Sequence, residues 1–273
     1  MNDKTRFGET ADAEVLRADK GGIATLTLNR AAARNALSLA LIDALRASID
    51  AIAADRQVRA VVLAANGPAF SAGHDLKELT AHRGDPDRGR AFYAEAMRRC
   101  ATMMQAIVAL PQPVIAAVEG VATAAGCQLV ATRDLAVAGE AASFGTPGVN
   151  IGLFCSTPMV ALTRNVAPKH AMELLLTGEL ADAPAAYRMG LVNRVVARGR
   201  ALAAAHALAA TIARKSTRVL AIGKKVFYAQ REMNLAEAYD YAADVMVQNM
   251  LVRDAEEGIG AFVEKREPKW QDR

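Results

Sequence analysis

The sequence predicts an α/β protein whose core repeats a strand–loop–helix unit. Two short, fully apolar runs, Ala60–Ala65 and Val114–Val118, are typical of strands that are buried on both faces. Each run leads through a glycine-containing turn into a helical segment, and the Ala-Gly pair at residues 72–73 recurs 53 residues later at 125–126. Hydrophobic residues make up 52% of the chain but aromatic residues only 5%, so small aliphatic side chains must build the core. Such side chains suit tight packing of helices on a sheet.

The first predicted elements are two strands and an amphipathic helix. The pattern predicts strands at residues 14–17 and 23–28, joined by a Lys-Gly-Gly turn at residues 20–22. Ser38 is a predicted N-cap, because leucine and isoleucine then recur at helical spacing as far as about Ala54.

A second helix and three shorter elements complete the predicted core. A stripe of Met, Cys and aromatic side chains runs along residues 92–107, stops before Pro111 and indicates a helix that faces the core. Further on, the pattern predicts a strand at residues 135–138, a helix that begins at 157–158 (TP), and a late strand at 191–196.

The chain changes character near residue 200. No strand pattern remains beyond Gly199, and about four helical segments run to Arg266. We therefore predict an α/β core over residues 1–199 and a helical association region over residues 200–273. Helices that continue past a completed core need a partner surface, so we expect this region to self-associate.

Composition and motifs exclude several function classes. The 273 residues carry 33 Lys+Arg against 29 Asp+Glu, a formal net charge of +4, and contain no apolar run long enough to cross a bilayer. Phosphate-loop and dinucleotide-binding glycine motifs, the GxSxG elbow and the paired-histidine zinc motif are absent. The three cysteines form no CxxC pair, so we expect buried, reduced thiols and no metal.

The opening residues bear on localisation. The first residues, MNDKTRFGETADAEV, include acidic side chains and no apolar stretch. This pattern fits neither a secretory signal nor a transit peptide. We therefore expect a cytoplasmic protein without a membrane partner.

One basic cluster stands out in the C-terminal half. It consists of Arg214, Lys215, Arg218, Lys224 and Lys225. Since no aromatic side chains interleave it as a base-stacking surface would require, the cluster favours a solvated helix face over a nucleic-acid groove.

The loop at residues 70–76 (FSAGHDL) is the first candidate site. A sharp turn at Gly73 leaves backbone N–H groups pointing outward, where the following helix favours negative charge. The loop at residues 123–126 (TAAG) occupies the same place in the second unit. If the two turns converge, they present two N–H donors to one carbonyl oxygen and form an oxyanion hole. The alternative is that both turns are purely structural.

Six motifs in sequence order resemble the crotonase superfamily, which includes the enoyl-CoA hydratases and isomerases. They are LTLNRAAARNALS, AFSAGHDLKEL, VIAAVEGVATAAGCQL, ASFGTPGVNIGL, LLLTGELADAPAAYRMGLVNRVV and EGIGAFVEKREP. Together they span roughly residues 12–268, and their sequences are similar to those of a divergent branch of the superfamily. The resemblance implies a ββα spiral core followed by helices that form a homotrimer or a dimer of trimers. It also implies an acyl-CoA thioester as ligand, with no cofactor, because coenzyme A enters as part of the substrate.

The resemblance further implies roles for individual residues. The oxyanion-hole donors fall on the backbone N–H groups of His74 and Ala125. The coenzyme A site falls on Ala33, Arg34, Ala72, Asp75, Leu76 and Lys77, and on Phe262 and Lys265 of a neighbouring subunit. Cys155 lies in a stretch near the acyl pocket, either as a catalytic thiol or as a small buried side chain. Asp75 could instead cap the next helix, and both lysines could be simple surface charge.

This sequence departs from the family at both catalytic carboxylates. Hydratases of the family use two glutamates, and the matching positions here are Gln128 and Gly148. Gln128 can orient a water molecule but cannot accept its proton, and Gly148 can do neither. We therefore expect hydratase activity to be weak or absent.

Several functions remain open. The favoured one is an acyl-CoA-binding protein of the crotonase fold that keeps the oxyanion hole. A second is a decarboxylase of a malonyl-type acyl-CoA, or an isomerase, in which the His74 ring orients the carboxylate or protonates the enolate; alternatively the ring only lines the pocket. A third is a non-catalytic module that sequesters acyl-CoA. RNA binding, as in one branch of the superfamily, is a further alternative for the basic cluster.

Overall fold

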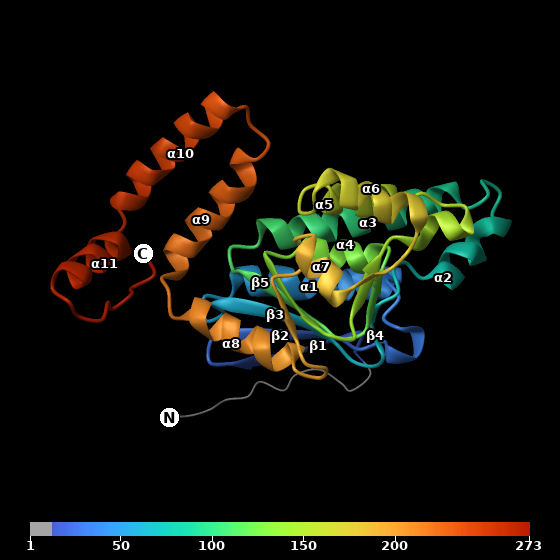
Figure 1. Cartoon of the computed structure of the whole chain (residues 1–273), viewed down its shortest axis with the longest axis horizontal. Coiled ribbons are helices and arrows are strands. Elements are labelled where there is room, and N and C mark those ends of the chain that lie inside the picture. Colours follow the sequence, from blue (N-terminus) through green and yellow to red (C-terminus); the bar gives the residue numbers. More distant parts are fainter. Residues whose placement is uncertain (1–12) are drawn as a thin grey trace.

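The computed structural model describes residues 13–273 as two stacked sheets with covering helices and a helical arm (Figure 1). The six-stranded sheet has the order β1 (Val15–Lys20), β2 (Ile23–Leu28), β3 (Ala60–Ala65), β5 (Val114–Val118), β7 (Leu135–Gly139), β10 (Arg194–Val196). The four-stranded sheet has the order β4 (Ala69–Ser71), β6 (Val121–Thr123), β8 (Ser143–Gly145), β9 (Ala181–Asp182). Only the β1–β2 and β8–β9 pairs are antiparallel.

Eleven α-helices accompany the sheets in the described part of the chain. They are α1 (Leu39–Ala54), α2 (Leu76–Ala81), α3 (Arg90–Ala109), α4 (Ala125–Ala131), α5 (Ser156–Leu162), α6 (Pro168–Thr177), α7 (Ala183–Arg188), α8 (Ala201–Ala213), α9 (Thr217–Gln230), α10 (Leu235–Met250) and α11 (Arg253–Val263). Over residues 13–273, none of them combines the length and apolar character that crossing a membrane needs.

The chain advances as a spiral, adding one strand to each sheet and then a helix. The units β3–β4–α2, β5–β6–α4 and β7–β8–α5 follow this order, and their strands pair in parallel within both sheets. The repeat seen in the sequence is therefore a structural repeat, and the predicted α/β ββα spiral is confirmed.

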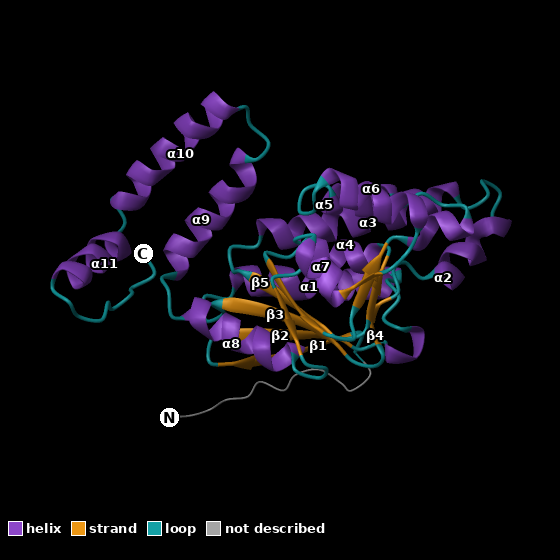
Figure 2. Cartoon of the chain, viewed as in Figure 1, coloured by secondary structure: helices purple, strands orange, loops and turns teal. Residues whose placement is uncertain are grey.

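Alanine-rich packing covers both faces of the six-stranded sheet. Alternate residues of β3 point to opposite faces, so Val61 and Leu63 join the large core beneath α1 and α3 while Ala60 and Val62 face α8. Helix α8 lies directly on this second face (Figure 2), where its alanines at 201, 205 and 209 are fully buried. Small side chains at this spacing let helix and sheet approach closely. The first helix of the predicted association region thus completes the core.

Three predicted boundaries were wrong by a few residues. Strand β1 extends through Lys20, because its ladder with β2 continues to the Lys20–Ile23 pair and leaves only two glycines for the turn. Helix α5 begins at Ser156, with Cys155 at the N-cap, rather than at Pro158 after a Thr157 cap, and Pro158 falls in its first turn, where a missing N–H is tolerated. The late strand contains only residues 194–196, because residues 191 and 192 turn inward and their amides bond to the Ala186 carbonyl.

Helices α9, α10 and α11 form an arm that projects from one side of the core (Figures 1 and 2). Asp134 connects this arm to the sheets: its carboxylate accepts hydrogen bonds from Lys224 Nζ at 2.7 Å, Tyr228 Oη at 2.9 Å and the Val114 amide at 2.7 Å. The Lys224 side chain is only 8% exposed. A buried ammonium group needs such a partner, so Asp134 fixes where α9 lies.

We predict that Asp134→Asn lowers the free energy of unfolding by about 3 kcal/mol, because it leaves a buried Lys224 charge without its counter-ion. Urea unfolding followed by circular dichroism measures the change. Asp50→Asn is the matched control, since Asp50 pairs with Arg46 on an exposed helix face and should change stability by less than about 0.5 kcal/mol. Equal effects of the two substitutions would contradict this role of Asp134.

Candidate active site

Two loops, one from each of the first two ββα units, meet backbone to backbone. Gly73 has a φ of 89°. A β-carbon on Gly73 would come within 2.9 Å of Ala124 Cβ and 3.0 Å of the Thr123 oxygen. A β-carbon on Gly126 would come within 2.2 Å of the Ser71 oxygen. Only glycine fits at either position, so the repeated Ala-Gly pair is what allows the loops to converge.

The junction leaves two backbone amides without an acceptor. Ala124 adopts φ 50° and ψ −119°, a conformation rare for a residue with a side chain and costing about 1–3 kcal/mol. Its strained turn starts α4 at Ala125, whose N–H, at the helix start, has no intrahelical acceptor. Among residues 13–273, neither the Ala125 amide nor the His74 amide donates a hydrogen bond. Both are therefore available to a ligand.

The segment after β2 holds the first loop in place. The Ala72 amide donates to the Arg34 oxygen at 3.0 Å, the Leu37 amide to the Gly73 oxygen at 2.7 Å, and the Asp75 amide to the Leu37 oxygen at 3.2 Å. These bonds bring together the two segments on which the predicted coenzyme A residues lie.

Asn35 and Ser71 support this arrangement and were not predicted. Asn35 is fully buried; its Nδ2 donates to the carbonyls of Asn66 and Ala69 at 2.9 and 2.8 Å, and its Oδ1 accepts from the Arg30 amide. Ser71 Oγ donates to the Asn35 carbonyl at 2.8 Å. An asparagine directly before the apolar pair Ala36 and Leu37 is the available sequence signal, because a buried amide must find partners.

Asp75 caps α2. Its Oδ1 accepts from the Lys77 and Glu78 amides at 3.0 and 3.2 Å, and its Oδ2 pairs with Arg30 at 2.7 Å. Partial burial opposes ionisation of Asp75, yet these bonds lower its pKa overall. The Leu76 and Lys77 side chains point outward and are exposed. The capping interpretation of Asp75 is thus confirmed.

The His74 ring lies half-buried beside its own free amide. Burial lowers the pKa of His74, although a hydrogen bond with the Leu37 backbone opposes this shift. Among residues 13–273, the buried Nε2 has no hydrogen-bond partner. The Leu37 bond therefore uses Nδ1, which leaves Nε2 of the neutral ring as an acceptor.

Gln128 and Gly148, the positions at which the resemblance to the family predicts catalytic glutamates, differ in what they could hold. Gln128 lies one turn after Ala125 on α4; its side chain is buried and, within the described residues, its Oε1 has no partner. At Gly148, a β-carbon would come within 2.5 Å of the Leu153 oxygen and 2.8 Å of Cys155 Sγ. Position 128 has room for a carboxylate, whereas no side chain fits at position 148.

The cysteines show no sign of activation. All three are buried with free thiols. Burial raises the pKa of Cys100 and Cys127 to about 12, and it also raises that of Cys155. The thiolate is the reactive form, so Cys155 is a packing residue against Gly148 rather than a nucleophile. Across residues 13–273, no group of three or more His, Cys, Asp or Glu side chains is placed to hold a metal ion.

Phe262 and Lys265 do not meet the loops within one chain. Phe262 lies in the last turn of α11 and Lys265 just beyond that helix, which is at the far side of the arm from α2 and α4 (Figure 1). The Phe262 side chain is 85% exposed. Any contribution of these residues to the site must come from another copy of the chain.

Comparisons with known proteins agree with the fold and motifs. The family described as enoyl-CoA hydratase/isomerase matches residues 18–273. Enoyl-CoA hydratase domain-containing protein 3, mitochondrial, of Rattus norvegicus is 46% identical over 249 residues, covering 91% of this chain and 81% of the rat protein. A crystal structure of an enoyl-CoA hydratase from Mycobacterium smegmatis gives a TM-score of 0.90 at 50% identity, over 94% of this chain and 98% of that one. The crystal structure of the human domain-containing protein 3 gives 0.89 at 44% identity, over 94% and 100%.

The expectation of a cytoplasmic protein was wrong. The rat, mouse and human relatives are all named mitochondrial proteins, which points to mitochondria instead. The expectation drew largely on residues 1–12, which lie outside the described residues. It also gave weight to the lack of an apolar stretch, although transit peptides are amphipathic rather than continuously apolar.

We predict that Gly148→Ala lowers the free energy of unfolding by about 1–3 kcal/mol, because the new methyl group overlaps the Leu153 carbonyl and Cys155 Sγ. Gly223→Ala is the control: nothing lies within 4 Å of that position, and alanine favours the helix by up to about 1 kcal/mol. Urea unfolding of both variants provides the comparison. A Gly148→Ala protein as stable as wild type would mean that position 148 is open.

We also predict a pH effect of His74. The unfolded chain binds a proton at this histidine near its ordinary pKa of 6.5, whereas the folded protein resists it, so the free energy of unfolding falls as the pH drops below about 6.5. His74→Gln should weaken this fall between about pH 7 and pH 5. Identical pH profiles for wild type and His74→Gln would refute burial of the neutral ring.

Proposed function

This chain belongs to the enoyl-CoA hydratase/isomerase family, and from that premise we propose that it binds an acyl-CoA thioester and polarises its carbonyl without hydrating it. The observation that carries the proposal is the pair of unsatisfied amides at His74 and Ala125, on loops locked together by Gly73 and Gly126. Coenzyme A enters as part of this ligand, and no other cofactor is required.

The two amides supply an electrostatic contribution. A thioester oxygen between them would accept two hydrogen bonds from donors that are already fixed, so little reorganisation accompanies charge development. One such donor is typically worth about 10²–10³ in rate. The strain at Ala124 supports this use, because it keeps the Ala125 amide directed away from the preceding strand.

Hydration needs more than this. Water must lose a proton to a base, and the α-carbon must gain one. Gln128 offers only an amide, and position 148 is closed to any side chain. Asp75, next to the His74 amide in sequence, is already committed to Arg30 and the α2 cap. The site therefore stabilises an enolate but does not add water.

The two free amides, together with the unpartnered Nε2 of His74, favour a second function, decarboxylation or isomerisation. In a malonyl-type thioester, the bond to the carboxylate breaks, CO₂ leaves, and the electron pair moves to the thioester oxygen held by the two amides. A proton then adds to the α-carbon from water. In isomerisation, Nε2 would instead accept an α-proton and return it further along the acyl chain. If neither occurs, the chain is an acyl-CoA-binding module.

We extend the proposal to a homotrimer or dimer of trimers. The ends of α10 and α11 expose large apolar side chains, among them Leu251 at 76%, Phe262 at 85% and Val263 at 73%. Large exposed apolar surfaces mark association sites. Association through this arm would cover these residues and offer Phe262 and Lys265 to the loops of a neighbouring copy.

The test is crotonyl-CoA hydration, followed by loss of the enoyl absorbance. Wild type should remain at background, and Gln128→Glu should raise the rate about 10²-fold, because a positioned base is worth about 10²–10⁴. Gln57→Glu, on the exposed turn after α1, is the control and should change nothing. Robust hydration by wild type would refute the proposal.

The same wild-type preparation separates the remaining functions. Release of labelled CO₂ from malonyl- or methylmalonyl-CoA, abolished in His74→Pro because the 74 amide is lost, would establish decarboxylation. Tight binding of acyl-CoA without CO₂ release or double-bond migration would establish the binding module.

A further inference from the structure

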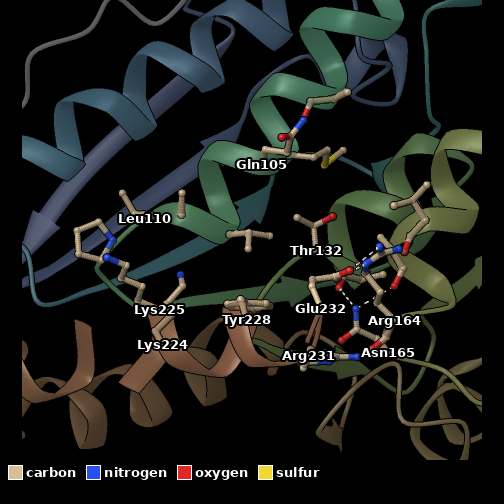
Figure 3. Close-up of a pocket in the computed structure, with 18 of the residues that line it drawn as sticks. Gln105, Leu110, Thr132, Arg164, Asn165, Lys224, Lys225, Tyr228, Arg231 and Glu232 are labelled. Atoms are coloured by element: carbon tan, nitrogen blue, oxygen red, sulfur yellow. Dashed lines mark hydrogen bonds and ion pairs between the residues drawn. The ribbon is translucent and has the colours of Figure 1, made fainter. Parts of the chain in front are cut away.

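A large groove separates α9 from the core. It has a volume of about 1010 Å³ and lies between α9 on one side and α3, α4 and α5 on the other. Figure 3 shows Lys224, Lys225 and Tyr228 on α9 facing Leu110 and Thr132 across it. The core side of the groove is largely apolar, with Val108, Leu110, Ala131, Val160 and Ala161 among its lining residues.

The α9 side of the groove is cationic. A helix that faces the body of a protein normally presents apolar residues there. Here Arg218 and Lys225, two turns apart on one face of α9, line the groove, and neither has a partner among residues 13–273. Arg231 lies 5.5 Å from the Phe227 ring centroid and bonds to the Arg164 carbonyl, but pairs with no carboxylate in the described chain.

The other charges of the groove are already neutralised. Lys224 pairs with Asp134 at 2.7 Å, and Arg164 pairs with Glu232 at 3.1 Å (Figure 3). Three cations therefore remain uncompensated opposite an apolar wall. A ligand that satisfies both sides must combine an apolar chain with an anionic group.

The groove reaches the candidate active site at Gln128. Gln128 lines the groove, and it follows Ala125 by one turn of α4. Thr132, one turn further, lines it too, so the groove follows the helix face that starts at the Ala125 amide. Gln128 is buried with an unpartnered Oε1, which identifies this end of the groove as a place where a ligand or its water is expected.

We propose that this groove binds the distal part of an acyl group that ends in a carboxylate, so that the preferred ligand is the monothioester of coenzyme A with a dicarboxylic acid. This inference rests on the proposed function. The methylene chain passes Gln128 and lies on the apolar wall, and the terminal carboxylate meets Arg218 and Lys225. Of the basic cluster noted in the sequence, Arg218 and Lys225 thus form the selective side of an acyl groove, while the neighbouring Tyr228 hydroxyl donates to Asp134.

The experiment compares matched pairs of thioesters by isothermal titration calorimetry: adipoyl- with hexanoyl-CoA, suberoyl- with octanoyl-CoA, and dodecanedioyl- with lauroyl-CoA. We expect the dicarboxylic member of at least one pair to bind about tenfold more tightly or better, the effect of partly desolvated ion pairs. The double variant Arg218→Gln, Lys225→Gln should abolish this preference and leave binding of the monocarboxylic member unchanged.

Lys215→Gln is the matched control, because Lys215 belongs to the same basic cluster but does not line the groove. It should keep the preference. Equal affinities of the two thioesters within every pair would overturn the proposal. A preference for the dicarboxylic thioester that survives the double variant would also overturn it. So would binding of free suberate that does not compete with suberoyl-CoA. If octanoyl-CoA binds and the second carboxylate does not increase the affinity, only the assignment of the groove is wrong. If no thioester binds, the proposed function itself is wrong.

Discussion

The site depends on one steric constraint, the backbone contact between the loops that follow β3–β4 and β5–β6. Neither Gly73 nor Gly126 can carry a β-carbon, because the opposite backbone lies within 3.0 Å of one would-be atom and 2.2 Å of the other. The strained Ala124 turn persists because this contact and its bond to Gly145 hold it. Asn35 holds the first of these units in place by donating to the Asn66 and Ala69 carbonyls at the two ends of the β3–β4 connection. As a result, the backbone amides of His74 and Ala125 are left without an acceptor at adjoining positions.

Much of the fold and of the loop positions could be predicted from the sequence, because the signals for them are local. Apolar runs marked β3 and β5 to the residue, helical spacing marked α1 and its Ser38 cap, and the Ala-Gly repeat marked the loops. What could not be predicted depends on distant partners. Closure of position 148 comes from Leu153 and Cys155 across a turn, and the unpartnered Nε2 of His74 comes from packing of the whole site. The start of α5 and the extent of β10 likewise depend on which carbonyl each amide finds.

Gln128 and Gly148, the two positions at which the family resemblance predicts glutamates, differ in how their surroundings constrain a side chain. At Gln128 the side chain is nearly isosteric with a carboxylate and faces a groove, so one atom separates it from a base. At Gly148 the Leu153 carbonyl and Cys155 Sγ occupy the space that a side chain would need, so the conformation of the loop itself excludes a glutamate. Chemistry that survives both changes must rely on fixed amide dipoles and on the His74 ring. The cationic face of α9 then selects among acyl groups rather than acting on them.

We propose that the junction of the two loops polarises a thioester carbonyl without hydrating the acyl group. Infrared difference spectroscopy of crotonyl-CoA labelled with ¹³C at the thioester carbonyl tests both parts in one sample. We expect the carbonyl stretch of the bound ligand to move to lower frequency, because two amides donate hydrogen bonds to the oxygen. The enoyl double bond should persist. An unshifted carbonyl band, or its conversion to that of a 3-hydroxyacyl thioester, would contradict it.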